Sequence, residues 1–562
     1  MTRSSWPIFK PQALCRHAPP RRRRYRTPVK KDAWLQSREL LKGGHPQIRH
    51  LAISSPFCHR PDMSHIRSLL LFLAALLPLS AAGRPNILWI FSEDLSPYMG
   101  CYDDPINTGF TPAIDKFAKD GVLFKRAFVP APVCSACRSA MITGVMQTTT
   151  GTHQHRSSRW TDGKIVPKDT RIHLPKGIKT IPELMRDAGY FTFNSGKDDY
   201  NFHYDRTKLY TVGSRKDYQP GQNGWQGNRA EHNMSITKDT WNARPDKKQP
   251  WFGQIEIKGG KAGKRYTRKG QVLKPTEVPL PPYFPDTPAL RSAWTTHYNA
   301  ARGADVRVET ILKQLEADGE LENTIVFFFS DHGNNQSLRH KQFCYEGGVH
   351  VPFMIKGNHP AISAGTVRDE LVNALDIPAT TLALGKAPLP DYLDGQNLFG
   401  ENYKPVDYVV SARDRCDYTI DRIRTVRTDK FRYLRNYYLD RPLLQAQYRD
   451  NRKEVIEFKA ARDAGKLNPY QKTHWFGLRP EEELYDLATD PHQINNLAAD
   501  PKFGTELKRH RDLLESWIKK TDDKGQYPES AVQLKATYGL WKDKPIFSKA
   551  KVNPEYDQFK KK

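Results

Sequence analysis

Two uninterrupted apolar runs, each ending in polar side chains, constrain the fold of this chain most. The runs span residues 87–91 and residues 324–329. Runs of this kind predict strands that are buried on both faces of a parallel sheet. Each run is followed within three positions by two side chains that can bind a metal: Glu93 and Asp94 after the first, Asp331 and His332 after the second.

These four side chains are expected to converge, because the functional crevice of an open α/β sheet lies beyond the carboxyl ends of its strands. A single polar pair would be read as a solvated strand end, but two pairs at matching positions favour a metal site. The three carboxylates would repel one another without a cation, and a hard divalent cation such as calcium would neutralise them. His332 judged alone would favour zinc or manganese.

Two further strands are predicted to end in lysine. Residues 190–193 lead to Lys197, and residues 250–257 lead to Lys261. Each strand places an ammonium group at the same crevice. Cations fixed there would stabilise the negative charge of an anionic ester in its transition state.

A reactive cysteine is predicted within residues 133–144, VCSACRSAMITG. Cys134 is followed one helical turn later by Arg138, whose positive charge would favour a thiolate. Cys134 and Cys137 also form a CxxC pair, which is typical of dithiol redox sites and of zinc half-sites. No second CxxC follows, and the chain shows no small thioredoxin-like repeat, so both of these interpretations are disfavoured.

The Cys-x-Ala-x-Arg pattern resembles the signature of type I sulfatases, members of the alkaline phosphatase superfamily. Further stretches are similar to the same family: TPAID at residues 111–115, YEGG-x-x-VP at residues 345–352, and an ELYDL run at residues 483–487. The C-terminal part is most similar to heparan N-sulfatases. In this family the cysteine is oxidised to formylglycine, whose hydrated aldehyde is the nucleophile.

The resemblance implies an α/β fold of the alkaline phosphatase type: a mixed, largely parallel sheet between helices, plus a smaller C-terminal α+β domain. It implies a calcium ion held by Glu93, Asp94, Asp331, His332 and residue 134. Lys197 and Lys341 would hold the sulfate oxygens, and Arg138 would hold the nucleophile. The implied partners are a sulfated carbohydrate substrate and a formylglycine-generating maturase.

Two histidines of the family pattern are missing. The family motif Gly-Lys-x-His reads Gly-Lys-Asp-Asp here, with Asp199 at the histidine position, and Lys261 stands where a second histidine is usual. The acid that protonates the leaving group must therefore come from elsewhere. His153 is the preferred candidate, because its distance from Cys134 in the sequence suits a loop folding back over the site; His155 and His340 are alternatives.

The N-terminal region predicts export. Residues 63–82 combine a charged start, an eleven-residue apolar segment and a small-x-small cleavage site, as in a secretory signal peptide. The uncharged stretch is too short for a stable membrane span. Residues 1–62 are then a mis-called, disordered extension. The remaining domains are predicted at residues 84–398 (catalytic), 399–540 (α+β) and 541–562 (a basic, solvated tail).

Nucleic-acid binding is disfavoured, and two other functions remain as alternatives to a sulfatase. The formal net charge of +26 suits an anionic substrate, and no nucleic-acid-binding motif accompanies it. The nearest alternative is a phosphodiesterase or phosphonate hydrolase on the same fold. The second alternative is a noncatalytic protein that binds sulfated glycans. The charged turn at residues 413–415 is expected either to contact the sugar and contribute to specificity or to be an exposed salt-bridged turn. The sequence does not identify the sugar.

Overall fold

The computed structural model describes residues 83–157, 171–212 and 240–560. The predicted signal peptide, the predicted extension before it and much of the polar segment after residue 212 lie outside these ranges. The described residues belong to one compact unit, Pro78–Lys562, and a second unit, Met1–Leu77, lies outside them. The predicted boundary between residues 398 and 399 therefore stays a prediction.

A seven-stranded mixed sheet forms the centre of the structure, with strand order β3-β4-β1-β5-β6-β2-β7. Strands β3, β4, β1 and β5 run parallel, β6 is antiparallel to both of its neighbours, and β2 and β7 are parallel to each other. The mixed, largely parallel sheet predicted from the sequence is confirmed. The strands are β1 (Asn86–Ser92), β2 (Val122–Phe128), β3 (Phe191–Ser195), β4 (Trp251–Ile257), β5 (Thr324–Ser330), β6 (His350–Lys356) and β7 (Thr366–Asn373).

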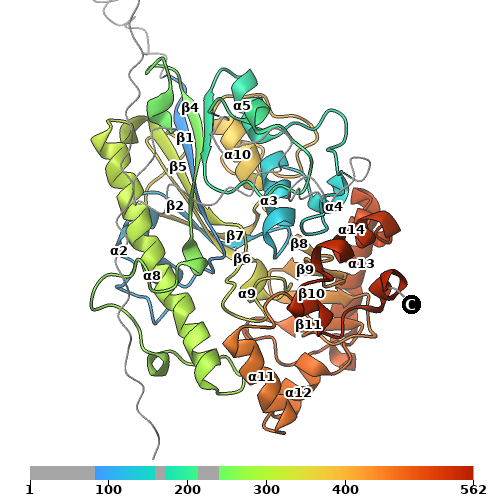
Figure 1. Ribbon diagram of the computed structural model, residues 1–562. Helices are drawn as coiled ribbons and strands as arrows, with labels where there is room; N and C mark the ends of the chain where they lie inside the picture. The colour runs from blue at the N-terminus through green and yellow to red at the C-terminus, as the bar shows by residue number, and fades with distance from the viewer. Residues whose placement is uncertain (1–82, 158–170, 213–239, 561–562) are drawn as a thin grey trace, which may run out of the picture. The chain divides into compact units, whose positions relative to one another are not determined.

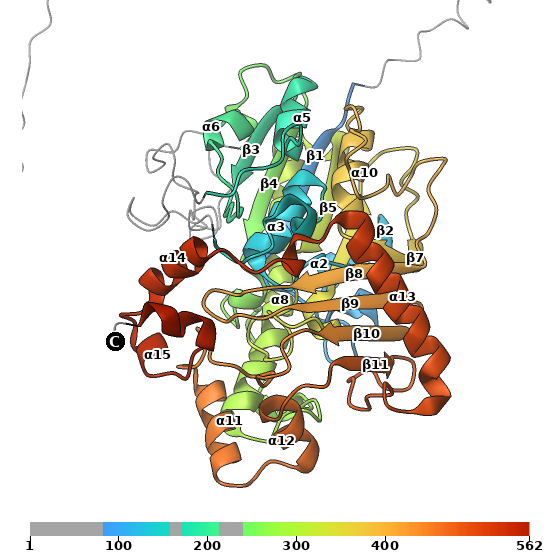
Figure 2. The same cartoon turned by 90° about the vertical axis from the view of Figure 1, so that its right-hand side faces the viewer.

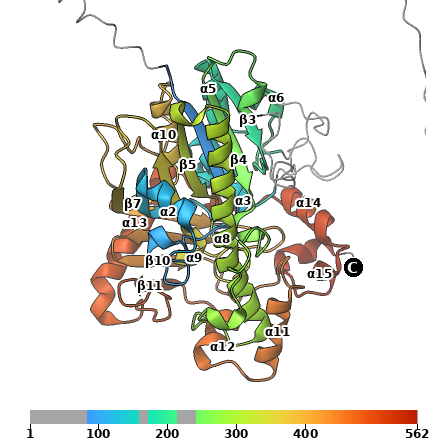
Figure 3. The same cartoon turned by 90° about the vertical axis from the view of Figure 1, so that its left-hand side faces the viewer.

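Helices cover both faces of this sheet, because successive side chains of each central strand point to opposite faces. On one face, Leu88, Ile90 and Phe328 pack with the long helix α8 (Pro288–Ala317). Trp89 and Phe329 face the other way, toward α3 (Cys134–Thr143), α5 (Ile181–Asp187) and α10 (Asp376–Leu384). Figure 3 shows α8 running along the first face, and Figure 1 shows the other helices on the opposite side.

A second, antiparallel sheet follows, with strand order β11-β10-β9-β8. Its strands are β8 (Tyr408–Arg413), β9 (Ile423–Thr428), β10 (Phe431–Asn436) and β11 (Glu482–Asp486). Helix α13 (Gly504–Thr521) crosses one face of this sheet (Figure 2). The remaining helices are α2 (Pro112–Lys119), α4 (Gln147–Thr150), α6 (Arg206–Leu209), α9 (Glu346–Val349), α11 (Lys453–Asp463), α12 (Pro469–Phe476), α14 (Ala531–Trp541) and α15 (Pro545–Ser548).

The two sheets are linked by partly buried ion pairs. Glu346, at the start of α9, accepts hydrogen bonds from Arg427 at 2.8 Å and from Arg432 at 2.7 Å. Burial alone would raise the pKa of Glu346, but these two guanidinium groups lower it to about 2. The YEGG stretch, which leads into β6 of the first sheet, is thereby fixed to β9 and β10 of the second.

The charged turn at residues 413–415 is structural rather than exposed. Arg413 and Arg415 are buried, and they pair with Asp421 and Glu529 at 3.4 and 2.6 Å. No helix in the described parts of the chain is long and apolar enough to span a bilayer.

Candidate active site

Cys134 occupies the first position of α3, at the carboxyl ends of the central strands. Its side chain is fully buried, and its Sγ atom lies 3.1 Å from Lys341 Nζ and 3.2 Å from His332 Nε2. Burial would raise the pKa of this thiol, but Lys197 and Lys341 lower it to about 6. The positive end of the helix dipole favours negative charge at the same position. Residue 134 therefore lies where an anionic nucleophile is stabilised.

Four predicted metal ligands form one buried cluster around this residue. The ligand atoms of Asp94, Cys134, Asp331 and His332 all lie within 4.8 Å of one another. Strands β1 and β5 pair in register at Ser92 and Ser330, so the residues that follow each strand become neighbours. The backbone N–H of Asp94 donates to Asp331 Oδ1 at 2.8 Å, which fixes the two carboxylates together.

The cluster fits a cation. His332 Nδ1 lies 2.7 Å from the carbonyl oxygen of Gly333 and donates to it, which leaves the lone pair of Nε2 facing Asp94 Oδ1 at 3.1 Å. Burial opposes a charge on this ring, yet Asp331 and Asp94 raise the pKa of His332 above its ordinary value. The electrostatic field that raises this pKa also favours a bound divalent ion.

Glu93, the fifth predicted metal ligand, lies beside this cluster and outside it. Its carboxylate accepts hydrogen bonds from the ammonium groups of Lys197 and Lys261. These charges lower the pKa of Glu93 against the effect of burial. The close approach of the Lys261 loop requires glycine, because a Cβ atom on Gly260 would lie 1.8 Å from the carbonyl oxygen of Asp94.

Arg138 contacts two carboxylates, Asp331 and Glu256, rather than the thiol. Its Nε donates to Asp331 Oδ2 at 3.0 Å, and its Nη1 contacts Glu256 Oε2 at 3.2 Å. The guanidinium lies over the ring of Phe91, 4.2 Å from its centroid. Arg138 therefore positions Asp331. Glu256 was not expected in the site, although a carboxylate inside the apolar run of β4 is a signal that could have identified it.

Three lysines gather at the same rim of the sheet. Lys341 Nζ lies 3.1 Å from both carboxylate oxygens of Asp94. Lys197 Nζ lies 3.1 Å from Asp199 Oδ2, so the aspartate that replaces the family histidine pairs with the predicted sulfate-binding lysine. Nearby carboxylates raise the pKa of Lys197 and Lys341 although burial lowers it, and both are charged at neutral pH.

The three candidate histidines lie in different surroundings. His340 packs against Trp294, and burial lowers its pKa to about 3. Burial lowers the pKa of His153. The charged groups that act on it most strongly, Asp414 and Arg424, belong to the side of the second sheet. His155 instead contacts Ser135, the residue after Cys134, with Nδ1 2.7 Å from Ser135 Oγ.

His155 also lines a cavity of about 340 Å³ that opens at the lysines. Its backbone N–H donates to the carbonyl of Arg415 at 2.8 Å, which holds the loop in place from a distant part of the chain. Arginine and lysine side chains line this cavity, and no Asp or Glu is among its lining residues. Three lining residues that sequence reasoning missed are Arg156, Tyr448 and Arg452.

The five described cysteines are all free, so no disulfide forms among them. The sequence left their pairing open. Cys137 points away from the cluster, with Sγ 3.6 Å from Met141 Sδ. Burial raises the pKa of the Cys137 thiol, in contrast to that of Cys134. The two residues of the CxxC motif therefore have opposite electrostatic environments.

Comparison with known proteins identifies similar chains. The sulfatase family model matches residues 85–387. An ulvan-active sulfatase of Formosa agariphila is 31% identical over 84% of this chain and 80% of its own length. The human N-sulphoglucosamine sulphohydrolase is 25% identical over 80% of this chain and 93% of its own. The solved structure of a 2-O GAG sulfatase has a TM-score of 0.53 at 20% identity, covering 79% of this chain and 94% of that one, which shows the shared fold.

Proposed function

The chain belongs to the sulfatase family and hydrolyses sulfate esters, and we propose that its substrates are sulfated carbohydrates and that residue 134 acts as formylglycine. The observation that carries this proposal is the meeting of residue 134, two carboxylates, an imidazole and three lysines at one rim of the sheet. The cationic cavity above them suits an anionic group. Relatives named for ulvan and for N-sulphoglucosamine support a carbohydrate substrate.

We propose calcium as the metal, held by Asp94, Asp331, His332 and residue 134, with Glu93 beside the site, where its carboxylate pairs with Lys197 and Lys261. Oxygen donors from carboxylates are the ligands that calcium prefers. A divalent cation at this position would polarise the sulfate group and favour deprotonation of a nearby hydroxyl. Arg138 keeps Asp331 oriented through the hydrogen bond from its Nε.

The lysines are assigned to the sulfate group. Lys341 and Lys197 are the two ammonium groups that most strongly lower the pKa of residue 134, so they are placed to hold oxygens of a sulfate next to it. The hydrated aldehyde supplies two hydroxyls on one carbon, one to bond to sulfur and one to expel sulfate, and each cycle consumes one water. A plain alcohol has no second hydroxyl with which to release the sulfate.

We assign the leaving-group acid to His155 rather than to His153, which the sequence favoured. The Ser135 backbone N–H donates to His155 Nδ1 at 3.3 Å, which places the proton of the neutral ring on Nε2. Burial and Arg156 hold the pKa of His155 well below its ordinary range. A bound sulfate adds negative charge beside the ring and raises that pKa, so that the ring takes up a proton together with the substrate.

Replacing His155 by glutamine tests this assignment. We expect kcat to fall about 10²- to 10⁴-fold on sulfate esters of sugar alcohols, and far less on nitrophenyl sulfate, whose leaving group needs no proton. His153→Gln, two residues earlier in the same loop, is the matched control and should show no such dependence on the leaving group. The assignment is wrong if the two variants exchange these behaviours.

Sulfate release tests the proposed activity against the alternatives. We expect the matured protein to hydrolyse aryl sulfate at least about 10²-fold faster than aryl phosphate, because the family model and the relatives that match this chain are those of sulfatases. Free sulfate and free phosphate are measured by ion chromatography. Faster phosphate release would favour the phosphodiesterase alternative. Tight binding of sulfated oligosaccharides without any turnover would favour the noncatalytic one.

The proposal has consequences for the maturation and the location of the protein. A maturase must oxidise Cys134 before the protein is active, because the thiol lacks the geminal hydroxyls. We also propose that the protein is exported, on the basis of the predicted signal peptide at residues 63–82.

A further inference from the structure

The C-terminal tail folds onto the second sheet's connecting loops instead of extending into solvent as the sequence predicted. Phe547, in α15, and Tyr556 are buried, and they pack in one cluster with Tyr418, Ile420 and Leu534. Their spacing among lysines has no helical or strand period, which is why the packing could not be predicted. Figure 2 shows α14 and α15 beside the antiparallel sheet.

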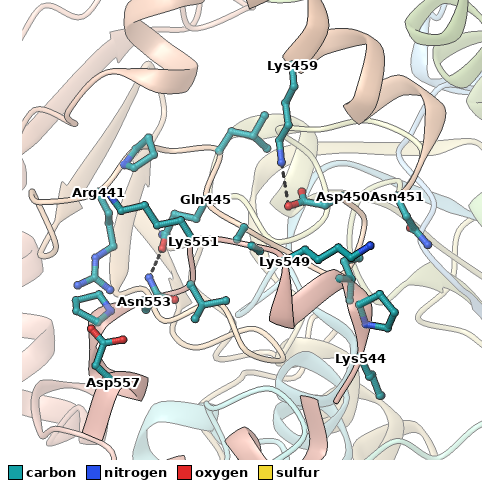
Figure 4. A pocket seen from close by; sticks show the side chains of 18 of the residues that line it. Arg441, Gln445, Asp450, Asn451, Lys459, Lys544, Lys549, Lys551, Asn553 and Asp557 are labelled. Atoms are coloured by element: carbon teal, nitrogen blue, oxygen red, sulfur yellow. Dashed lines mark hydrogen bonds and ion pairs between the residues drawn. The ribbon is translucent and has the colours of Figure 1, made fainter. Parts of the chain in front are cut away.

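A cavity of about 1340 Å³ lies between this tail and residues 440–462. Seven Lys and Arg side chains line it, against three Asp side chains. Figure 4 shows Lys459 at the top of the hollow, and Lys544, Lys549 and Lys551 of the tail spread around the rest of it. The cavity is several times larger than the cavity beside Cys134, and none of the predicted catalytic residues lines it.

Three of the tail lysines have no carboxylate partner. Arg441 pairs with Glu555 at 2.9 Å, and Lys459 pairs with Asp450 at 2.9 Å. Lys544, Lys549 and Lys551 make no ion pair with any residue in the described ranges, and all three are exposed. The tail therefore contributes positive charge to this cavity that no carboxylate of the described residues neutralises.

A third cavity, of about 220 Å³, borders both this hollow and the cavity lined by Lys261 and Lys341, which is called the catalytic cavity below. It shares His155 and Arg156 with the catalytic cavity, and it shares Lys544 with the tail cavity. Trp541 and Leu540 of α14 line it between these shared residues. The three cavities are therefore neighbours, and they extend from the lysines of the catalytic cavity to the tail.

We propose that the tail cavity binds further sugar residues of a sulfated glycan chain whose scissile sulfate lies at residue 134. This inference rests on the proposed function for the identity of the ligand. A single sulfated sugar is matched by the catalytic cavity alone, since small-molecule sites typically measure about 300–1,000 Å³. The larger cationic hollow matches a longer polyanion, for which unpaired lysines supply attraction along the chain.

The test measures binding without turnover. In a Cys134→Ala background, the dissociation constants of a heparin-derived dodecasaccharide and of a heparin-derived disaccharide are measured by titration calorimetry. We expect Lys549→Glu combined with Lys551→Glu to weaken binding of the dodecasaccharide at least about tenfold, with a much smaller effect on the disaccharide. The loss should shrink as salt is added, because exposed charges are screened.

Lys119→Glu combined with Lys404→Glu is the matched control. Both residues are exposed, neither has an ion pair in the described ranges, and the change in net charge is identical. Figure 3 shows α2, which contains Lys119, far from α14 and α15. The proposal is overturned if the tail variant binds the dodecasaccharide as the parent does, or if the control weakens binding equally. Because no turnover is measured, this result is independent of whether the parent releases sulfate.

Discussion

Replacing Cys134 by alanine is expected to lower sulfate release at least about 10⁴-fold relative to the matured parent protein. The side chain at this position is the nucleophile in the proposed mechanism, and no neighbouring group within the cluster can replace its two hydroxyls. Cys134→Ser should be equally slow in steady state, because a serine hydroxyl offers no second hydroxyl to expel sulfate. Release is measured as free sulfate from a sulfated oligosaccharide.

Cys137→Ala is the control for this experiment. Cys137 lies in the same helix, is equally buried and belongs to the same CxxC motif, but its thiol contacts Met141 and not the metal cluster. We expect its kcat to match that of the parent and its free energy of unfolding to fall by about 1 kcal/mol, from the loss of one buried atom. A Cys137→Ala variant as inactive as Cys134→Ala would indicate dithiol chemistry and contradict the proposed mechanism.

Removing divalent cations by prolonged chelation is expected to lower kcat about 10³-fold, and calcium should restore it. The reason is electrostatic. Asp94 and Asp331 lie side by side in a buried cluster, so their negative charges need a cation. The lysines around Asp94 do not supply it during catalysis, because they then bind the sulfate. The unfolding temperature should rise with the concentration of added calcium, because a ligand of the native state stabilises it. Activity is measured with calcium, manganese and zinc in parallel.

Two variants distinguish the metal site from other buried carboxylates. Asp331→Asn should raise the calcium concentration needed for half-maximal activity at least about tenfold. Asp104→Asn should leave it unchanged, because Asp104 is also buried but accepts hydrogen bonds from the backbone N–H groups of Ile106 and Asn107. Full activity after exhaustive chelation would contradict the metal assignment, and restoration by zinc alone would contradict calcium.

The central part of the fold, and the meeting of Asp94, Asp331 and His332 at one rim of the sheet, could be predicted from local sequence. The apolar runs at residues 87–91 and 324–329 form adjacent parallel strands, β1 and β5, so the polar residues that follow them meet at one rim. The same reasoning placed Lys197 and Lys261 there, after β3 and β4. These predictions needed only the period of the runs and the rule that functional groups lie beyond carboxyl strand ends.

The remaining features depend on contacts between distant parts of the chain. Strand β6 lies antiparallel between β5 and β2, which no single stretch of sequence indicates. The position of His155 is set by a backbone hydrogen bond to Arg415, 260 residues away. His153 and His155 could not be distinguished without that contact. Arg138 was expected to act on the thiol, but the two carboxylates that it binds, Asp331 and Glu256, come from separate strands.

The most direct test is the mass of the tryptic peptide that contains residue 134, isolated from protein produced together with a formylglycine-generating enzyme. Conversion of Cys134 to formylglycine predicts the loss of mass that accompanies replacement of a thiol by an aldehyde oxygen, and reaction of that peptide with a hydrazine probe. An unmodified cysteine in protein that releases sulfate at full rate would contradict it.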